Sequence, residues 1–129
     1  LHALAEELGL KANVKFLGKI SEKEKLAWFQ KAWVFVNPSM MEGWGITTIE
    51  ANACGVPVVA SDIPGLRDSV QNPHTGFLVP YGDTEALADK ITLLCTDTMT
   101  REKMGSAGLA WAQNFGWNKS AQLFLKILS

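Results

Sequence analysis

Two carboxylates and two glycines share one short stretch of this sequence. Glu42 and Glu50 are separated by seven residues, and the tripeptide Gly43-Trp44-Gly45 lies between them. An apolar run that is typical of a buried strand, Val34-Phe35-Val36, precedes the stretch, and a helical pattern begins after the second glycine. A strand, a glycine loop and a helix start bring backbone N–H groups and the positive helix end together, and this arrangement binds phosphates. The pattern therefore predicts a site for a phosphate-bearing ligand with an acid on either side.

Each of these residues also has a purely structural interpretation. The glycines by themselves are equally consistent with a plain tight turn, because a short glycine motif is a weak signal. The sequence from Thr47 to Glu50 fits a capping box, and on spacing alone we favour this role for Glu50 over one as acceptor for ribose hydroxyls. Glu42 precedes the glycines and is too early to cap the helix, so solvent exposure is its alternative.

Two other kinds of chemistry fit parts of the stretch. Glycoside hydrolysis needs two carboxylates across a sugar, but nothing else in the sequence supports it. A dinucleotide site would use a G-x-G-x-x-G loop followed by an acid, for which Asp62 is placed suitably. Thr48 replaces the third glycine of that motif, and the loop before Gly43 is long for its tight first turn. An oxidoreductase is therefore the weaker alternative.

The composition is that of one globular domain. The chain has 129 residues, of which 47% are hydrophobic and 19% are charged, and its net charge is −1. This balance gives no electrostatic reason to expect binding to nucleic acid or to an anionic membrane. Cys54 and Cys95 lie in apolar helical patterns, so we expect each to be a buried apolar side chain rather than part of a disulfide or zinc site. Residue 1 already lies within a helical pattern, and we expect the chain to be part of a longer protein.

Strand patterns alternate with helix patterns along the whole chain. The expected strands are residues 14–18, 33–36, 57–60 and 76–79, and the expected helices are residues 1–8, 21–32, 46–54, 63–70, 83–95, 98–114 and 118–128. Alternation of this kind predicts an α/β fold, a Rossmann-like parallel sheet with helices on both faces. Ligands bind such sheets beyond the carboxyl ends of the strands, which here carry the loops 18–21, 38–45, 61–65 and 80–83.

Several motifs in a fixed order resemble the retaining GT-B glycosyltransferases of the large group 1 family, also called family 4. Glu42 and Glu50 match the family's E-x7-E motif, and residues 42–45 match its E-G-[FYW]-G loop. Residues 53–60 match its A-C-G-x-P-V-V-A segment. Further matches fall on residues 14–18, 75–80 and 83–88. The resemblance covers nearly the whole chain.

The resemblance implies what the chain would do. Residues 1–129 would form a single donor-binding domain that lacks its first strands, which in the family lie between the strand at 14–18 and the strand at 33–36. The acceptor-binding half would be absent too, so we expect the full-length parent to be an enzyme and this segment alone to be inactive. A nucleotide-sugar-binding module without turnover remains an alternative.

The resemblance also assigns residues to roles. Glu42 would be the catalytic residue and contact the donor sugar near the reacting carbon, and Glu50 would hold the ribose hydroxyls. The remaining donor-binding residues would be Gly43, Trp44, Gly45, Ile46 and Thr47 around the sugar and diphosphate, and Gly18, Lys19 and Ile20 along the base. The substrate would be a UDP-, GDP- or ADP-sugar, without a metal or another cofactor.

The remaining implications concern partners and location. The acceptor would be a sugar, a lipid or a small molecule bound by an N-terminal domain, and no nucleic acid would be involved. The resemblance implies a cytoplasmic protein and allows peripheral membrane association of the parent. Two departures from the family pattern lie close to the expected site. Pro64 replaces a frequent glycine, and Met40-Met41 stands before Glu42 where the family usually has a residue followed by an aromatic.

Overall fold

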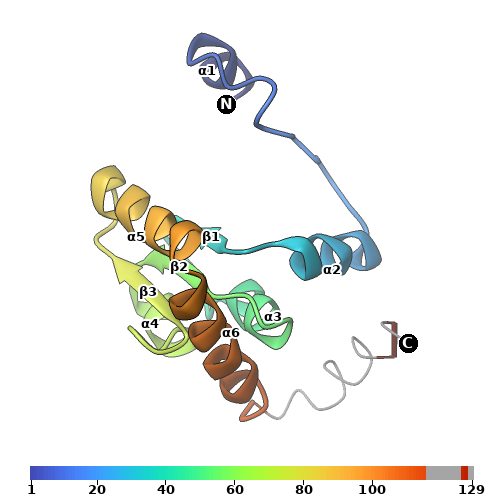
Figure 1. Cartoon of the computed structure of the whole chain (residues 1–129), viewed down its shortest axis with the longest axis vertical. Helices are drawn as coiled ribbons and strands as arrows, with labels where there is room; N and C mark the ends of the chain where they lie inside the picture. Colours follow the sequence, from blue (N-terminus) through green and yellow to red (C-terminus); the bar gives the residue numbers. More distant parts are fainter. Residues whose placement is uncertain (116–125, 128–129) are drawn as a thin grey trace.

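The computed structural model describes residues 1–115 and 126–127, and it shows an alternating α/β chain (Figure 1). In order, the elements are α1 (His2–Glu7), α2 (Glu22–Lys31), β1 (Phe35–Asn37), α3 (Ile46–Ala53), β2 (Val58–Ser61), α4 (Pro64–Ser69), β3 (Gly76–Val79), α5 (Thr84–Thr96) and α6 (Thr98–Ala112).

The three strands form one parallel sheet in the order β1-β2-β3. Phe35 of β1 is opposite Val58 of β2, which in turn is opposite Gly76 of β3. Each connection between neighbouring strands contains a helix, as parallel pairing requires. The carboxyl ends of the strands therefore lie at one edge of the sheet, and the loops that follow Asn37 and Ser61 leave from that edge. This arrangement confirms the predicted fold class.

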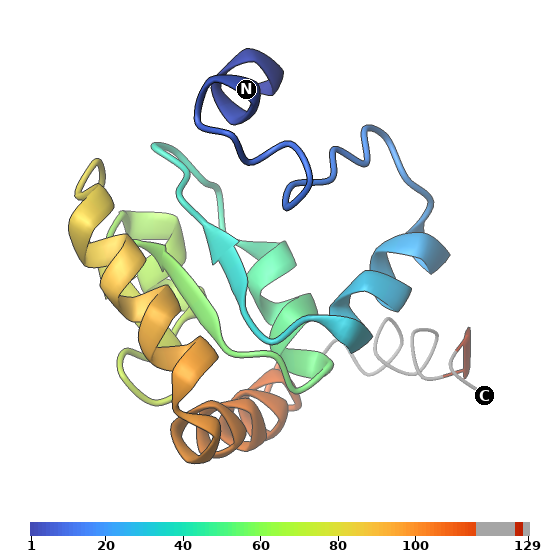
Figure 2. The same cartoon turned by 45° about the horizontal axis from the view of Figure 1, so that its top comes forward.

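Helices lie on both faces of the sheet (Figure 2), and a hydrophobic core fills the space on each face. Successive side chains of a strand point to opposite faces, and β2 follows this rule because Val58 and Ala60 belong to one core and Val59 belongs to the other. The first core also contains buried side chains of α2, α3 and α4, whereas Leu94 of α5 and Met104 of α6 complete the second. All of β2 is buried, as expected for a central strand with helices on both faces.

Helix α6 approaches α3 closely because two of its residues have no side chain. A Cβ atom at Gly108 would lie 2.7 Å from Nδ2 of Asn52, and one at Gly105 would overlap the carbonyl oxygen of Gly55. Asn52 is fully buried and donates hydrogen bonds to the carbonyl oxygens of Val56 (3.0 Å) and Thr75 (3.3 Å). This contact fixes the position of α3, the helix that follows the glycine loop.

Helix starts follow the sequence closely where a capping residue is present. The helix expected from residue 21 begins with a capping box of Ser21 and Glu24, with hydrogen bonds of 2.8 and 3.1 Å. Asp83 accepts a hydrogen bond from the N–H of Ala86 at the start of α5. Gly9 follows α1 with a φ of 67°, as a helix stop signal predicts.

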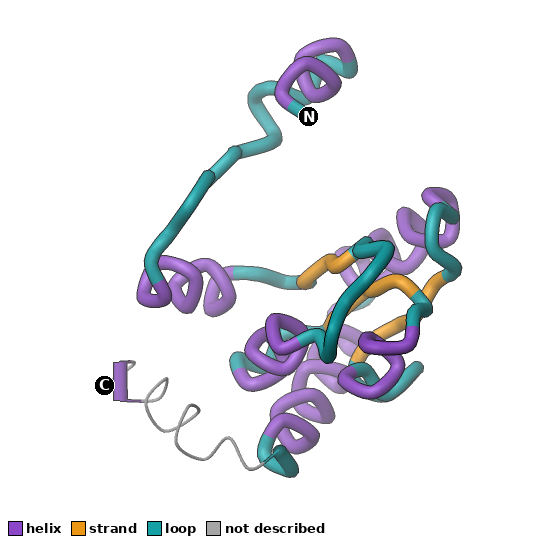
Figure 3. Tube along the Cα trace, turned by 180° about the vertical axis from the view of Figure 1, so that it is seen from behind, coloured by secondary structure: helices purple, strands orange, loops and turns teal. Residues whose placement is uncertain are grey.

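The expected strand at residues 14–18 is wrong. The segment forms no strand, and Val14, Phe16 and Leu17 are exposed. Its alternation of apolar and polar residues has the period of a strand. Within the described residues, however, β1 pairs only with β2, and no strand forms backbone hydrogen bonds with this segment. Together with α1, the segment extends away from the sheet (Figure 3).

Three smaller expectations concern the cysteines, Trp33 and the last helix. Cys95 on α5 is exposed rather than buried, whereas Cys54 is half-buried against the first core. Trp33, expected at the start of a strand, precedes β1 and is 58% exposed. The helix expected at residues 118–128 lies for the most part outside the described residues.

Candidate functional site

The turn between β1 and α3 is built around Gly45, the residue that caps α3. Gly45 has left-handed backbone angles, φ 66° and ψ 46°, which side chains oppose and glycine tolerates. A Cβ atom here would lie 2.6 Å from Oγ of Ser69 and 2.7 Å from Cδ2 of Leu66. The second glycine of the motif is therefore required both by backbone conformation and by its packing against α4.

Gly43, the first glycine of the motif, does not share this role. Its φ is not positive, it is exposed, and a Cβ atom would meet nothing within 4 Å. A third glycine contributes instead. A Cβ atom at Gly65 of α4 would overlap the carbonyl oxygen of Glu42 and lie 2.7 Å from that of Gly43. The sequence pattern around Gly65 predicts only a short helix, yet Gly65 is what lets α4 support the loop.

The start of α3 presents backbone donors that no group in the described part of the chain accepts from. No side chain caps this helix, and the first intrahelical bond runs from the N–H of Thr48 to the carbonyl oxygen of Gly45 (3.0 Å). Within the described part of the chain, the N–H groups of Gly45, Ile46 and Thr47 donate no hydrogen bond to another group. Free N–H groups at a helix N-terminus, together with the helix dipole, favour an anion.

Glu42 is held by a neutral donor. Its Oε1 atom accepts a hydrogen bond from Nδ2 of Asn37 (3.2 Å), and Oγ of Ser39 lies 3.5 Å from the same oxygen. Asn37 is the last residue of β1 and is 6% exposed, whereas the Glu42 side chain is half-buried. Glu42 has no ion-pair partner among the residues that the structure describes. Solvent exposure, the alternative for Glu42, is thus only partly correct.

Glu50 is held by a cation from another helix. Nζ of Lys25 on α2 lies 3.1 Å from Oε2 and 3.3 Å from Oε1 of Glu50, and 2.9 Å from Oε2 of Glu22. Burial lowers the pKa of Lys25, but the hydrogen bonds and charges of Glu22 and Glu50 outweigh it, so this pKa is raised. The capping-box interpretation of Glu50 is wrong because Gly45 caps α3 without a side-chain bond.

The negative charge of Glu50 also affects Cys54 at the end of α3. Burial, reinforced by Glu50, raises the pKa of the Cys54 thiol to about 11.

The residues of the dinucleotide alternative have other partners. The side chain of Thr48, which replaces the third glycine of that motif, is fully buried, donates a hydrogen bond to the carbonyl oxygen of Gly45 and shares a hydrogen bond with Oγ of Ser69 (2.8 Å). Asp62, the acid of that alternative, pairs with Arg67 at 2.6 Å.

The other predicted donor-binding residues fall into two groups. Ile46 is exposed and Thr47 half-buried at the start of α3, while Trp44 packs edge-on against Phe115, with ring centroids 4.9 Å apart. The loop with Gly18, Lys19 and Ile20 precedes α2, and none of these three residues forms a hydrogen bond or ion pair with Glu42 or Glu50.

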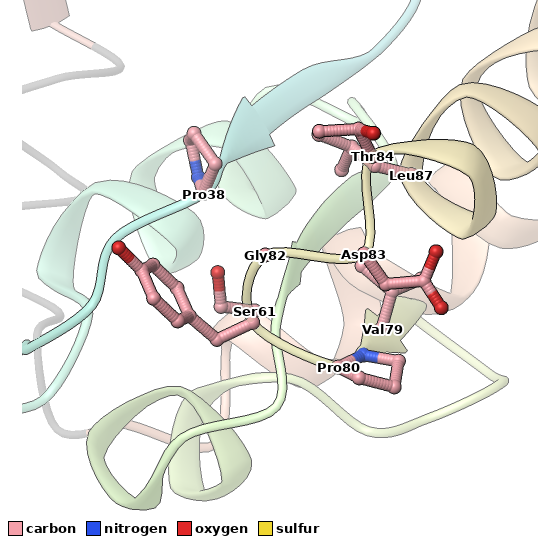
Figure 4. A pocket seen from close by; sticks show the side chains of 9 residues that line it. Pro38, Ser61, Val79, Pro80, Gly82, Asp83, Thr84 and Leu87 are labelled. Atoms are coloured by element: carbon pink, nitrogen blue, oxygen red, sulfur yellow. The ribbon is translucent and has the colours of Figure 1, made fainter.

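A small pocket lies at the carboxyl edge of the sheet, next to the turn (Figure 4). It has a volume of about 120 Å³ and brings together three of the four loops expected at this edge. It is lined by Pro38, Ser61, Val79, Pro80, Tyr81, Gly82, Asp83, Thr84 and Leu87. Neither Glu42 nor Glu50 lines it, and pockets for whole small molecules are usually several hundred Å³. It is thus separate from the two acids.

The described residues contain no group of three His, Cys, Asp or Glu side chains that could hold a metal ion. In the same part of the chain, no helix is long and apolar enough to span a membrane.

Comparison with known proteins decides the family. A family model described as Glycosyl transferases group 1 matches residues 1–111. The chain belongs to this family. The match includes the glycine loop, both acids, the three strands and nearly all of α6.

Relatives of this group 1 chain are themselves glycosyltransferases. D-inositol 3-phosphate glycosyltransferase of Kribbella flavida is 38% identical over 122 residues, which are 95% of this chain and 29% of the relative. The protein of the same name from Paenarthrobacter aurescens is 36% identical over 126 residues, 98% of this chain and 31% of the relative. The chain therefore spans about a third of the length of the curated relatives it matches.

Solved structures agree with this assignment. Sucrose-phosphate synthase from Thermosynechococcus elongatus has a TM-score of 0.86 and 34% identity, with 98% of this chain and 32% of that chain covered. Anabaena HepE, solved in complex with UDP-glucose, has a TM-score of 0.83 and 29% identity, with 98% and 35% covered. These neighbours are GT-B glycosyltransferases, so the fold of the group 1 chain is that of part of a GT-B enzyme.

Proposed function

We propose that this chain supplies the donor-binding site of a retaining glycosyltransferase that uses a nucleotide-diphosphate sugar. The observation that carries the proposal is the start of α3, where N–H groups of Gly45, Ile46 and Thr47 have no acceptor in the described chain and an acid lies on either side. The HepE complex with UDP-glucose, at 29% identity, supports the choice of ligand class.

The chemistry follows from where charge develops. When the bond between the anomeric carbon and the diphosphate oxygen breaks, its electron pair stays on the diphosphate. N–H groups that are already oriented stabilise this charge without reorganisation, and the helix dipole adds to the effect. The glycine loop packs against α4 at Gly45 and Gly65, so its N–H groups are already in position before the nucleotide-sugar binds.

The two acids have different tasks in this proposal. Glu42 accepts hydrogen bonds from hydroxyls of the donor sugar near the reacting carbon, and we place it in the catalytic role. Glu50 accepts hydrogen bonds from the ribose hydroxyls. Trp44, Gly43, Ile46 and Thr47 would surround the sugar and diphosphate, and the loop of Gly18, Lys19 and Ile20 would lie along the base.

The test uses the full-length gene product with UDP-, GDP- and ADP-sugars. Binding of one of them should shift the amide resonances of residues 43–47 and 50, and transfer to an acceptor should be measurable with that donor. The proposal fails if none of the three donors shifts these resonances. A nucleotide-sugar-binding module without turnover would show the shifts but no transfer, and an oxidoreductase would respond to NAD(P) instead.

A further inference from the structure

We propose that Asn37 is a positioning residue for Glu42, acting through a side-chain amide whose orientation Ser39 fixes. The inference rests on the proposed function, because it concerns how the acid next to the donor sugar is kept in place. It adds a residue to which neither the sequence motifs nor the family resemblance assigned a role.

The direction of the Asn37 amide follows from its partners. The backbone N–H of Ser39 can only donate, and it lies 3.3 Å from Oδ1 of Asn37. The Ser39 hydroxyl donates to the same oxygen at 2.6 Å. With Oδ1 engaged on this side, Nδ2 faces Glu42 and donates to its Oε1 atom at 3.2 Å. A flipped amide would lose the bond from the Ser39 N–H and turn its own oxygen toward the carboxylate.

The location of Asn37 makes it a rigid partner for Glu42. Asn37 is the last residue of β1 in a parallel register with Ala60 of β2, and it is 6% exposed. Glu42, by contrast, lies in a loop and has a long side chain that loses rotamer freedom when it is held. A hydrogen bond to a charged carboxylate is stronger than one between neutral groups, so a buried amide at a strand end is a suitable anchor.

The hydrogen bond from Asn37 leaves the second carboxylate oxygen of Glu42 available to the substrate. Asn37 donates to Oε1 of Glu42, Oγ of Ser39 also lies nearer this oxygen (3.5 Å), and Oε2 has no hydrogen-bond partner in the described part of the chain. Oε2 can then accept a hydrogen bond from a donor-sugar hydroxyl while Oε1 stays anchored. The other charged groups at this edge are engaged elsewhere: Glu50 with Lys25, Asp62 with Arg67, and Asp83 with the start of α5.

The sharpest test is Asn37→Asp in the full-length gene product, because it changes the amide NH₂ to an oxygen at constant shape. Near neutral pH the introduced carboxylate repels Glu42, so kcat should fall roughly ten- to a hundredfold while the Kd for UDP changes less than about threefold. As the pH falls, burial and the neighbouring charge favour protonation of the introduced carboxylate, which then donates to Glu42 as the amide did. The ratio of variant to wild-type kcat should therefore rise as the pH is lowered from about 8.5 to about 5.5.

A purely structural role predicts something else. It would lower activity, UDP affinity and thermal stability together, with a flat ratio of kcat values across pH. The matched control is Asn72→Asp, the same change at an exposed position whose Oδ1 accepts from the N–H of Leu78, a role that an aspartate can keep. We expect wild-type kcat at every pH for this control. A flat ratio for Asn37→Asp, or an equal loss of UDP affinity, overturns the inference.

Two further measurements keep the outcome decisive. If Asn37→Asp does not fold, Ser39→Ala removes the 2.6 Å bond to the amide and should lower kcat by roughly threefold to tenfold without changing the Kd for UDP. Unchanged kcat in Ser39→Ala would then reject the inference. Failure of the proposed function is recognised separately, because the wild type would show no transfer, or Glu42→Gln would retain it.

Discussion

The two acids beside the glycine turn are held in opposite ways. On the loop side, Glu42 is anchored by the uncharged amide of Asn37, which Ser39 orients, and has no cation paired with it in the described chain. On the helix side, Glu50 is paired with the ammonium group of Lys25, with the Lys25 and Glu50 side chains 24% and 21% exposed. A neutral anchor leaves the charge of Glu42 available to a substrate, whereas a salt bridge already compensates much of the charge of Glu50.

This difference suggests a division of labour between transfer and binding. An uncompensated carboxylate interacts strongly with groups that change during the reaction, such as the developing positive charge on a donor sugar. A compensated carboxylate that still accepts hydrogen bonds is better suited to hold a diol that does not react. Substitutions on the two sides should therefore affect different kinetic constants.

The largest effect is expected for Glu42→Gln. The change keeps shape and removes the charge, so kcat should fall by roughly a hundred- to a thousandfold while the Kd for UDP stays within about threefold. Steady-state kinetics and titration calorimetry on the full-length gene product measure the two quantities. Glu102→Gln, at an exposed position of α6, is the control and should behave as wild type. Equal losses in kcat and in UDP affinity would contradict the assigned role.

The next effect is on stability and separates the two glycines of the loop. Gly45→Ala introduces a side chain at φ 66° and within 2.6–2.7 Å of Ser69 and Leu66, so unfolding free energy should fall by about 2–4 kcal/mol. Gly43→Ala meets open space and should change stability by less than about 0.5 kcal/mol. Urea titrations of the pair give the difference. Similar losses for both would mean that the turn is not built around Gly45.

The contrast between these glycines also shows where local sequence patterns succeed. Sequence patterns predict β3 with its observed bounds, and Ser21 and Asp83 predict the starts of α2 and α5, because each depends on neighbours a few residues apart. The pattern G-x-G, however, does not say which glycine takes a positive φ. That depends on packing against Ser69 and Leu66, which are distant from Gly45 in the sequence.

The misses in the site have the same origin. Glu50 matches a local capping pattern, but its real partner, Lys25, comes from another helix and is 25 residues distant. Residues 14–18 have the alternation of a strand, yet a strand also needs a neighbour, and no sequence period reports whether one is present. The contact between Asn37 and Glu42 spans only five residues, but it crosses an irregular loop for which no spacing rule exists.

Glu50→Gln should show the complementary kinetic phenotype to Glu42→Gln. The neutral amide accepts hydrogen bonds less strongly than a carboxylate and loses the pairing with Lys25, so the Kd for UDP and the donor KM should rise roughly tenfold. At saturating donor, kcat should remain within about threefold of the wild type, because the ribose does not change during transfer. A loss confined to kcat would reverse the proposed division between the acids.

The smallest effect concerns the Lys25 salt bridge itself. Lys25→Met keeps most of the apolar stem and removes the charge, and a partly exposed pair contributes less than about 1 kcal/mol. The pKa of Lys25 is raised in the folded chain, so its stabilising contribution is complete below the unfolded pKa and is lost as the pH rises through the folded value. Denaturation at neutral pH should show the small difference, and it should vanish above the raised pKa. A difference that persists at high pH would show that Lys25 acts by packing, and the helix-side acid would then be held by shape rather than by charge.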